Sequence, residues 1–86
     1  MEISFAPNFL RTLRSLPLAL REEVKEKIFL LQDQKNHHSL RVHKLKGRLG
    51  RCYAFSVNYK FRIIFQYVGK PPRAYLINIG DHDLYD

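Results

Sequence analysis

The sequence predicts an α+β fold: a short N-terminal strand, a two-helix hairpin, and then an antiparallel β-meander of about four strands, with the helices packed on one face of the sheet. Apolar residues recur at helical spacing in the first half of the chain and at every second position in the second half. With 86 residues, the chain has room for one small core. We therefore expect a single domain spanning residues 1–86.

Residues 2–5 alternate polar and apolar side chains, which predicts a short strand with Ile3 and Phe5 facing inward. Pro7 then suits the first turn of a helix. Pro17 ends this helix, because proline cannot continue it and disfavours helical geometry in the residue before it. The apolar stripe of the first helix is Phe9, Leu10, Leu13 and Leu16.

A longer helix is expected after Pro17, because four apolar residues form a stripe along one of its faces. These residues are Leu20, Val24, Ile28 and Leu31. The periodicity ends in the polar segment 36–39, where we expect the helix to give way to a loop.

The second half of the chain predicts four strands. Their inward residues are Val42 and Leu45, then Tyr53, Phe55 and Val57, then Phe61, Ile63 and Phe65, then Tyr75, Ile77 and Ile79. Turn residues at 47–50, 58–60 and 69–72 join neighbouring strands into an antiparallel meander. Across the turn at 58–60, Ser56 and Arg62 should lie side by side on the face that the helices leave uncovered.

The composition favours an anionic partner. The 15 lysine and arginine residues outnumber 8 aspartate and glutamate residues, and the net charge is +7. Such a charge suits a nucleic acid about as well as an acidic protein, so it leaves both open.

The single Cys52, predicted to be a small apolar filler, excludes an internal disulfide and a cysteine metal cluster. No apolar run is long enough to span a membrane, and we expect a soluble cytoplasmic protein.

Three segments occur together in this order of elements: the basic loop Lys44-Leu45-Lys46-Gly47, the strand from Tyr59 through Arg62-Ile63-Ile64-Phe65, and the tail Gly80-Asp81-His82-Asp83-Leu84-Tyr85. In this respect the chain resembles the RelE/ParE superfamily of toxins from type II toxin–antitoxin systems. The resemblance implies a RelE-like fold and a ribosome-dependent mRNA endoribonuclease that needs neither a metal nor a cofactor. It also implies three partners: the ribosome, mRNA, and a cognate antitoxin that forms a hetero-oligomer with the toxin.

The resemblance also assigns roles to individual residues. Arg62 stands where the family has a phosphate-binding arginine. His82 is the expected proton-transfer group, and Tyr85 is expected to position the substrate. His43 is a second titratable candidate, ranked below His82. The residues expected to bind RNA are Lys44, Lys46, Arg48, Arg51 and Ser56.

The chain departs from the best-known RelE pattern at Ala54 and Ser56, where that pattern has lysines. This departure keeps two alternatives open. One is a ParE-like inhibitor of DNA gyrase, against which His82 argues. The other is a non-catalytic relative that only binds an antitoxin, which the missing lysines favour.

Overall fold

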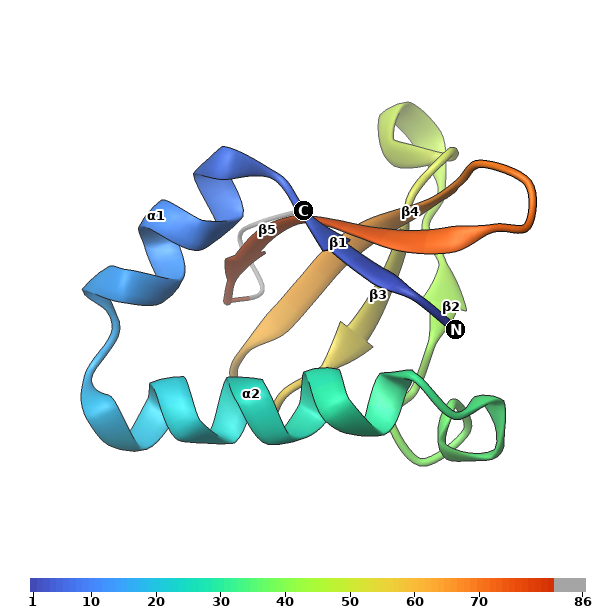
Figure 1. The fold of residues 1–86 in the computed structure, drawn as a ribbon. Helices are drawn as coiled ribbons and strands as arrows, with labels where there is room; N and C mark the ends of the chain where they lie inside the picture. The colour runs from blue at the N-terminus through green and yellow to red at the C-terminus, as the bar shows by residue number, and fades with distance from the viewer. Residues whose placement is uncertain (82–86) are drawn as a thin grey trace.

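The structure is a computed structural model in which residues 1–81 are described (Figure 1). The helices and strands follow one another in the predicted order, with a short 3₁₀ turn on either side of the second strand. They are β1 (Ile3–Phe5), α1 (Pro7–Ser15), α2 (Leu18–Leu31), η1 (Gln34–Asn36), β2 (His43–Lys44), η2 (Gly47–Leu49), β3 (Tyr53–Ser56), β4 (Arg62–Val68) and β5 (Arg73–Gly80).

The described strands form one mixed sheet in the order β1-β5-β4-β3-β2. Strands β2 to β5 make the predicted antiparallel meander. Strand β1 adds to the free edge of β5 in parallel, with Ile3 opposite Ala74 and Phe5 opposite Leu76. The N-terminal strand was predicted, but the sequence did not indicate its partner, because the two strands are separated by almost the whole chain.

Helix α1 begins at Pro7, as the pattern predicts, and α2 begins directly after Pro17. The prediction that the second helix continues to residue 36 is wrong, because α2 ends at Leu31. Residues 34–36 form a separate 3₁₀ turn, in which the Asp33 carboxylate accepts a hydrogen bond of 3.1 Å from the backbone N–H of Lys35. Among residues 1–81, no helix has both the length and the apolar character needed to cross a bilayer.

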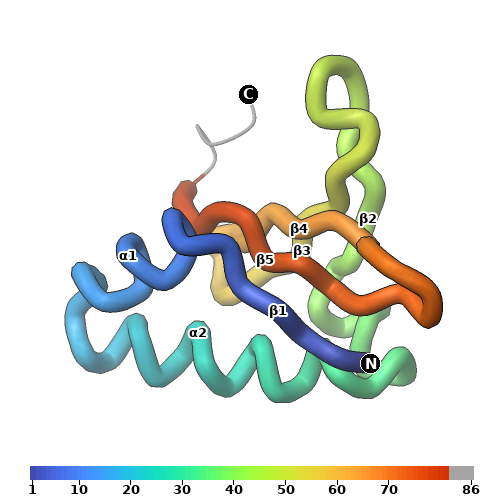
Figure 2. The backbone as a smooth tube through the Cα atoms, turned by 45° about the horizontal axis from the view of Figure 1, so that its top comes forward, coloured from blue at the N-terminus to red at the C-terminus, as the bar shows by residue number. Residues whose placement is uncertain are grey.

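The main core lies between the helices and one face of the sheet (Figure 2). Val24 and Ile28 of α2 pack there with Phe55 and Phe65 of the sheet. Phe5 faces the same side, as predicted, but it remains 39% exposed. β1 is an edge strand, and the Phe5 ring lies tilted against the ring of Phe9, with ring centroids 5.8 Å apart.

A second, smaller core occupies the opposite face of the sheet. It consists of Leu45, Cys52, Ala54 and Ile64, with Leu49 of η2 and Ile77 packed against it. The sheet therefore has apolar packing on both faces, whereas the sequence predicted a cover on one face only. The predicted role of Cys52 as an apolar filler is confirmed, since its side chain is buried in this cluster.

Candidate functional site

The turn between β3 and β4 sets the geometry of the site. Ser56 and Arg62 are directly paired across the hairpin, as predicted. Between them, the Asn58 side-chain oxygen accepts hydrogen bonds of 2.8 Å from the backbone N–H groups of Lys60 and Phe61, which closes an Asx turn. The Asn58 amide nitrogen donates a 2.8 Å hydrogen bond to the Glu23 carboxylate. One side chain thus shapes the turn and attaches it to α2.

The same turn orients Arg62. Its Nη1 donates hydrogen bonds to the backbone oxygen of Asn58 at 2.7 Å and to that of Phe61 at 3.1 Å. Among residues 1–81, the hydrogen bonds of this guanidinium all come from Nη1. A guanidinium has five N–H donors, so the remaining ones suit an oxyanion ligand. The half-buried Arg62 is therefore held in place without its binding capacity being used up.

Ser56 and Arg62 face a cavity of about 480 Å³, which we call the basic cavity. Its walls come from three places: α2, the segment 39–41, and the β3–β4 hairpin. The lining residues are Lys27, Leu30, Ser39, Leu40, Arg41, Ser56, Val57, Asn58, Tyr59 and Arg62. Three of these carry a positive charge, and no acidic residue of the described chain is among them. A concave surface with charges of one sign concentrates anions.

His43 lies on the same face of the sheet as Ser56. It pairs with Ala54, two residues before Ser56 on β3, so the His43 and Ser56 side chains are diagonal neighbours. The His43 Nδ1 lies 2.8 Å from the backbone oxygen of Arg41. Because a carbonyl oxygen only accepts, Nδ1 carries the proton and Nε2 of the neutral ring is the basic nitrogen. His43 is thus an imidazole on this face whose ring is oriented by the Arg41 backbone.

The four cations predicted to bind RNA in the loop do not line the basic cavity. Lys44, Lys46, Arg48 and Arg51 are exposed on β2 and around η2. This loop extends away from the helices, on the other side of the sheet from α2 (Figure 2). The structure thus separates the predicted RNA-binding residues into a projecting basic loop, which carries these four cations, and the cavity residue Ser56.

Two predicted catalytic residues, His82 and Tyr85, lie outside the described residues. The cavity also contains groups that the sequence did not single out: Lys27, Ser39 and Arg41. Lys27 follows the buried Val24 by three positions and directly precedes Ile28, so its position at the border of the apolar stripe was the available signal.

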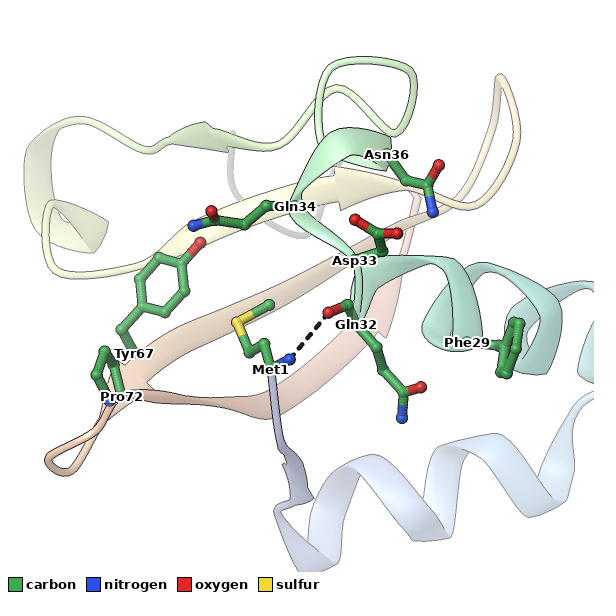
Figure 3. A pocket seen from close by; sticks show the side chains of 8 residues that line it. All are labelled: Met1, Phe29, Gln32, Asp33, Gln34, Asn36, Tyr67 and Pro72. Carbon is green, nitrogen blue, oxygen red and sulfur yellow. Dashed lines mark hydrogen bonds between the residues drawn. The ribbon is translucent and has the colours of Figure 1, made fainter.

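A second cavity, of about 640 Å³, lies where α2 ends (Figure 3). We call it the N-terminal cavity because Met1 stands at its centre, between Tyr67 and Pro72 on one side and Phe29 on the other. The other lining residues are Gln32, Asp33, Gln34 and Asn36. The Met1 ammonium donates a 2.9 Å hydrogen bond to the backbone oxygen of Gln32 (Figure 3). No lysine or arginine of the described chain lines this cavity.

Tyr67 lines the N-terminal cavity, and its surroundings shift its pKa. Partial burial, and then the neighbouring Tyr53, raise the pKa of the Tyr67 phenol above its ordinary value of 10.0. The phenol is therefore neutral at physiological pH.

Of the two cavities, only the basic cavity offers several positive charges to a polyanion.

Within residues 1–81, no three side chains of histidine, cysteine, aspartate or glutamate are grouped as a metal site requires.

No protein-family model matches the sequence, and no curated protein matches it. Solved structures do match over nearly the whole chain. A toxin–antitoxin complex, RelBE2 from Mycobacterium tuberculosis, contains a chain that is 16% identical, with a TM-score of 0.74 and coverage of 94% of this chain and 96% of that chain. The archaeal RelE-RelB complex from Pyrococcus horikoshii gives 19% identity, a TM-score of 0.73 and 96% coverage of both chains.

A YoeB/ParE toxin from Agrobacterium tumefaciens gives 12% identity and a TM-score of 0.69, with coverage of 95% of this chain and 99% of that chain. These likenesses confirm the fold that the motifs predict: the chain has the fold of the RelE/ParE toxins.

Proposed function

We propose that this chain, with its RelE-like fold, is the toxin of a type II toxin–antitoxin system and acts as a metal-independent, ribosome-dependent mRNA endoribonuclease that inhibits translation. One observation carries the proposal: the paired Ser56 and Arg62 form part of the wall of a cavity that two further cations line. The chain is similar in fold to proteins whose structures are described as the RelE toxin of E. coli.

The proposed reaction is cleavage by the RNA itself. The 2′-oxygen of a nucleotide attacks the adjacent phosphorus, and the bond from phosphorus to the 5′-oxygen breaks. A cyclic phosphate and a free 5′-hydroxyl result. Negative charge grows on the phosphorane, and we assign its stabilisation to Arg62, a cation of the cavity wall. Ser56, opposite Arg62, donates a hydrogen bond to the same phosphate.

The reaction also needs one group to accept the proton of the 2′-hydroxyl and one to donate a proton to the 5′-oxygen. His82 remains the first candidate for proton transfer, and Tyr85 for positioning the substrate. His43 is the second candidate, supported by its position on the face that carries Ser56. Two histidines would supply both roles, because an imidazole titrates near neutral pH.

The projecting basic loop has a separate role in this proposal. Lys44, Lys46, Arg48 and Arg51 hold RNA phosphates on the ribosome without reading bases.

The proposed antitoxin binds as an acidic helix or strand across the helical hairpin or the basic face, since charge complementarity favours such a partner. Several of the similar solved structures, among them RelBE2 from Mycobacterium tuberculosis and RelBE from E. coli, are described as toxin–antitoxin complexes.

The non-catalytic alternative is supported by a specific observation. Ala54 is fully buried, at 0% exposure, in the small core beneath η2. Alanine carries no charge, so this position, where the best-known RelE pattern has a lysine, supplies no cation to an RNA, and its burial leaves it no contact with one. A ParE-like inhibitor of DNA gyrase is the remaining alternative.

The test compares wild type with Arg62→Ala and with Arg14→Ala, an exposed arginine of α1 that lines neither cavity. After induction in a bacterial host, growth, translation and mRNA ends are followed, the last by primer extension. Wild type should arrest translation and cut mRNA. Arg62→Ala should cut at a rate lower by roughly 10²-fold or more, as expected when a charge-stabilising group is lost. Arg14→Ala should behave like wild type.

Three outcomes contradict the proposal in different ways. Full cleavage by Arg62→Ala removes Arg62 from the mechanism. Gyrase-dependent DNA breaks with intact mRNA identify the ParE-like alternative. An absence of toxicity in wild type favours the antitoxin-binding relative.

A further inference from the structure

We propose that Lys27 and Arg41 form a second phosphate site in the basic cavity, which binds the RNA phosphate next to the one held by Arg62. The inference rests on the proposed function, because it concerns the same RNA. It adds a residue of α2 and a residue of the segment 39–41 to a site that the sequence placed on the sheet, the basic loop and the C-terminal tail. The juxtaposition that carries it is the position of all three cations on the wall of one cavity.

Lys27 reaches the cavity from α2. Its side chain is only 25% exposed, so its aliphatic stem is packed against the protein. The Lys27 Nζ lies 3.7 Å from the carboxylate of Glu26, which is itself 65% exposed. A loose ion pair with an exposed partner contributes little to stability, so it competes weakly with a phosphate. Lys27 is thus a cation of the cavity wall whose ammonium makes a weak ion pair with an exposed partner.

Arg41 reaches the cavity from the opposite loop, and its backbone is unusual. Its φ angle is 58°, in the left-handed region, where glycine or asparagine is more easily accommodated than arginine. The backbone is held on both sides: the Arg41 N–H donates 3.0 Å to the His38 oxygen, and the Arg41 oxygen accepts from His43. An arginine kept in such a conformation beside a cavity points to a role for its side chain.

The arrangement suits two consecutive phosphates. Ser56 connects the two halves of the site, because its backbone N–H donates 2.8 Å to the oxygen of Leu40, next to Arg41, while the residue pairs with Arg62. The cavity, at about 480 Å³, falls in the range of small-ligand sites and has room for a nucleotide. Tyr59, 89% exposed at the cavity wall, offers a ring on which a base can stack.

The probe for the test is a fluorescent 2′-O-methyl uridine trinucleotide, which has two phosphodiesters and cannot be cut because the attacking hydroxyl is blocked. Its affinity for the purified full chain is measured by anisotropy between 50 and 300 mM KCl. Lys27→Gln and Arg41→Gln should each weaken binding by about tenfold, as expected when one charged hydrogen bond is removed. The double variant should also lower the slope of log K against log salt by about 0.7 for each phosphate that the protein no longer neutralises.

The matched controls are Lys25→Gln and Arg14→Gln, which remove the same charges from exposed positions outside both cavities. They should retain wild-type affinity and slope. Equal weakening by control and cavity variants would overturn the proposal, because net charge alone would then explain binding. Failure of wild type to bind the probe would overturn it as well.

The assay separates this inference from the proposed function. If the cavity variants bind the trinucleotide like wild type while wild type cuts mRNA in cells, the second phosphate site is wrong and the nuclease proposal stands. If they lose affinity and salt slope while wild type cuts nothing, the site is supported and the nuclease proposal fails. Circular dichroism of each variant verifies that it is folded.

Discussion

The basic cavity and the N-terminal cavity are of comparable size, about 480 and 640 Å³, and the same helix contributes to both. Lys27 and Leu30 of α2 line the first, whereas Phe29 and the adjoining Gln32 line the second. Each pair is spaced by three residues and so lies on one face of the helix, and successive residues are rotated by about 100°. Volume does not distinguish the two regions, but the side chains that the helix directs into each of them do.

The difference is one of charge and of hydrogen-bonding capacity. The basic cavity combines three cations with three hydroxyl groups, those of Ser39, Ser56 and Tyr59. In the N-terminal cavity, the Met1 ammonium already donates to Gln32, and Phe29 is 70% exposed. A polyanion therefore meets three cations in the first region, whereas in the second the Met1 ammonium is accompanied by the Asp33 carboxylate. Three substitutions test this comparison, from the largest expected effect to the smallest.

Phe65→Ala should damage both regions together. Phe65 is fully buried on β4, the strand that carries Arg62 and Tyr67, and its ring contacts those of Tyr53, Phe55 and Tyr67. Removing a buried phenylalanine ring typically costs about 3–5 kcal/mol of unfolding free energy. Urea denaturation measures this loss. Phe29→Ala is the control, because truncating an exposed ring should change stability by less than about 0.5 kcal/mol. A loss below about 1 kcal/mol for Phe65→Ala would contradict the assigned core.

Asn58→Ala should affect the basic cavity and leave the N-terminal cavity unchanged. The change removes the Asx turn and the bond to Glu23, and leaves the backbone that accepts from Arg62 less ordered. We expect a loss of about 1–3 kcal/mol in unfolding free energy and weaker trinucleotide binding.

Asn8→Ala is the matched control for Asn58→Ala, since the exposed Asn8 amide makes a long hydrogen bond of 3.4 Å to Asn78. It should leave stability and RNA binding nearly unchanged. If Asn58→Ala binds the trinucleotide like wild type, the turn does not position Arg62.

Tyr67→Phe should affect the N-terminal cavity alone, and only at alkaline pH. Burial raises the pKa of Tyr67 in the folded state, so the unfolded state loses this proton first as the pH rises. The contribution of the neutral Tyr67 phenol to the free energy of unfolding is fully present below the ordinary tyrosine pKa of 10.0. It is lost as the pH rises through the folded-state pKa. Wild type should therefore lose stability more steeply than Tyr67→Phe above about pH 10 in urea denaturation series. Parallel curves would contradict this assignment.

Local patterns predicted most of the elements. Alternation and the turn at 58–60 predicted both the hairpin and the pairing of Ser56 with Arg62, because a short turn determines which residues lie opposite each other. The end of α2 was misplaced, because the polar segment after Leu31 permits a 3₁₀ turn as well as a helix. The position of β1 beside β5 could not be predicted, since it depends on contacts between the two ends of the chain.

The sequence by itself determined the α+β class, the meander and the side of the hairpin on which Arg62 stands, because these follow from residue spacing and from turn chemistry. Only the tertiary structure decided what surrounds that residue. It buried Ala54 beneath η2, separated the projecting basic loop from the cavity, and brought Lys27 and Arg41 to the same cavity wall as Arg62. Periodicity predicts the face of an element on which a side chain lies, whereas packing between distant elements decides which other side chains lie beside it.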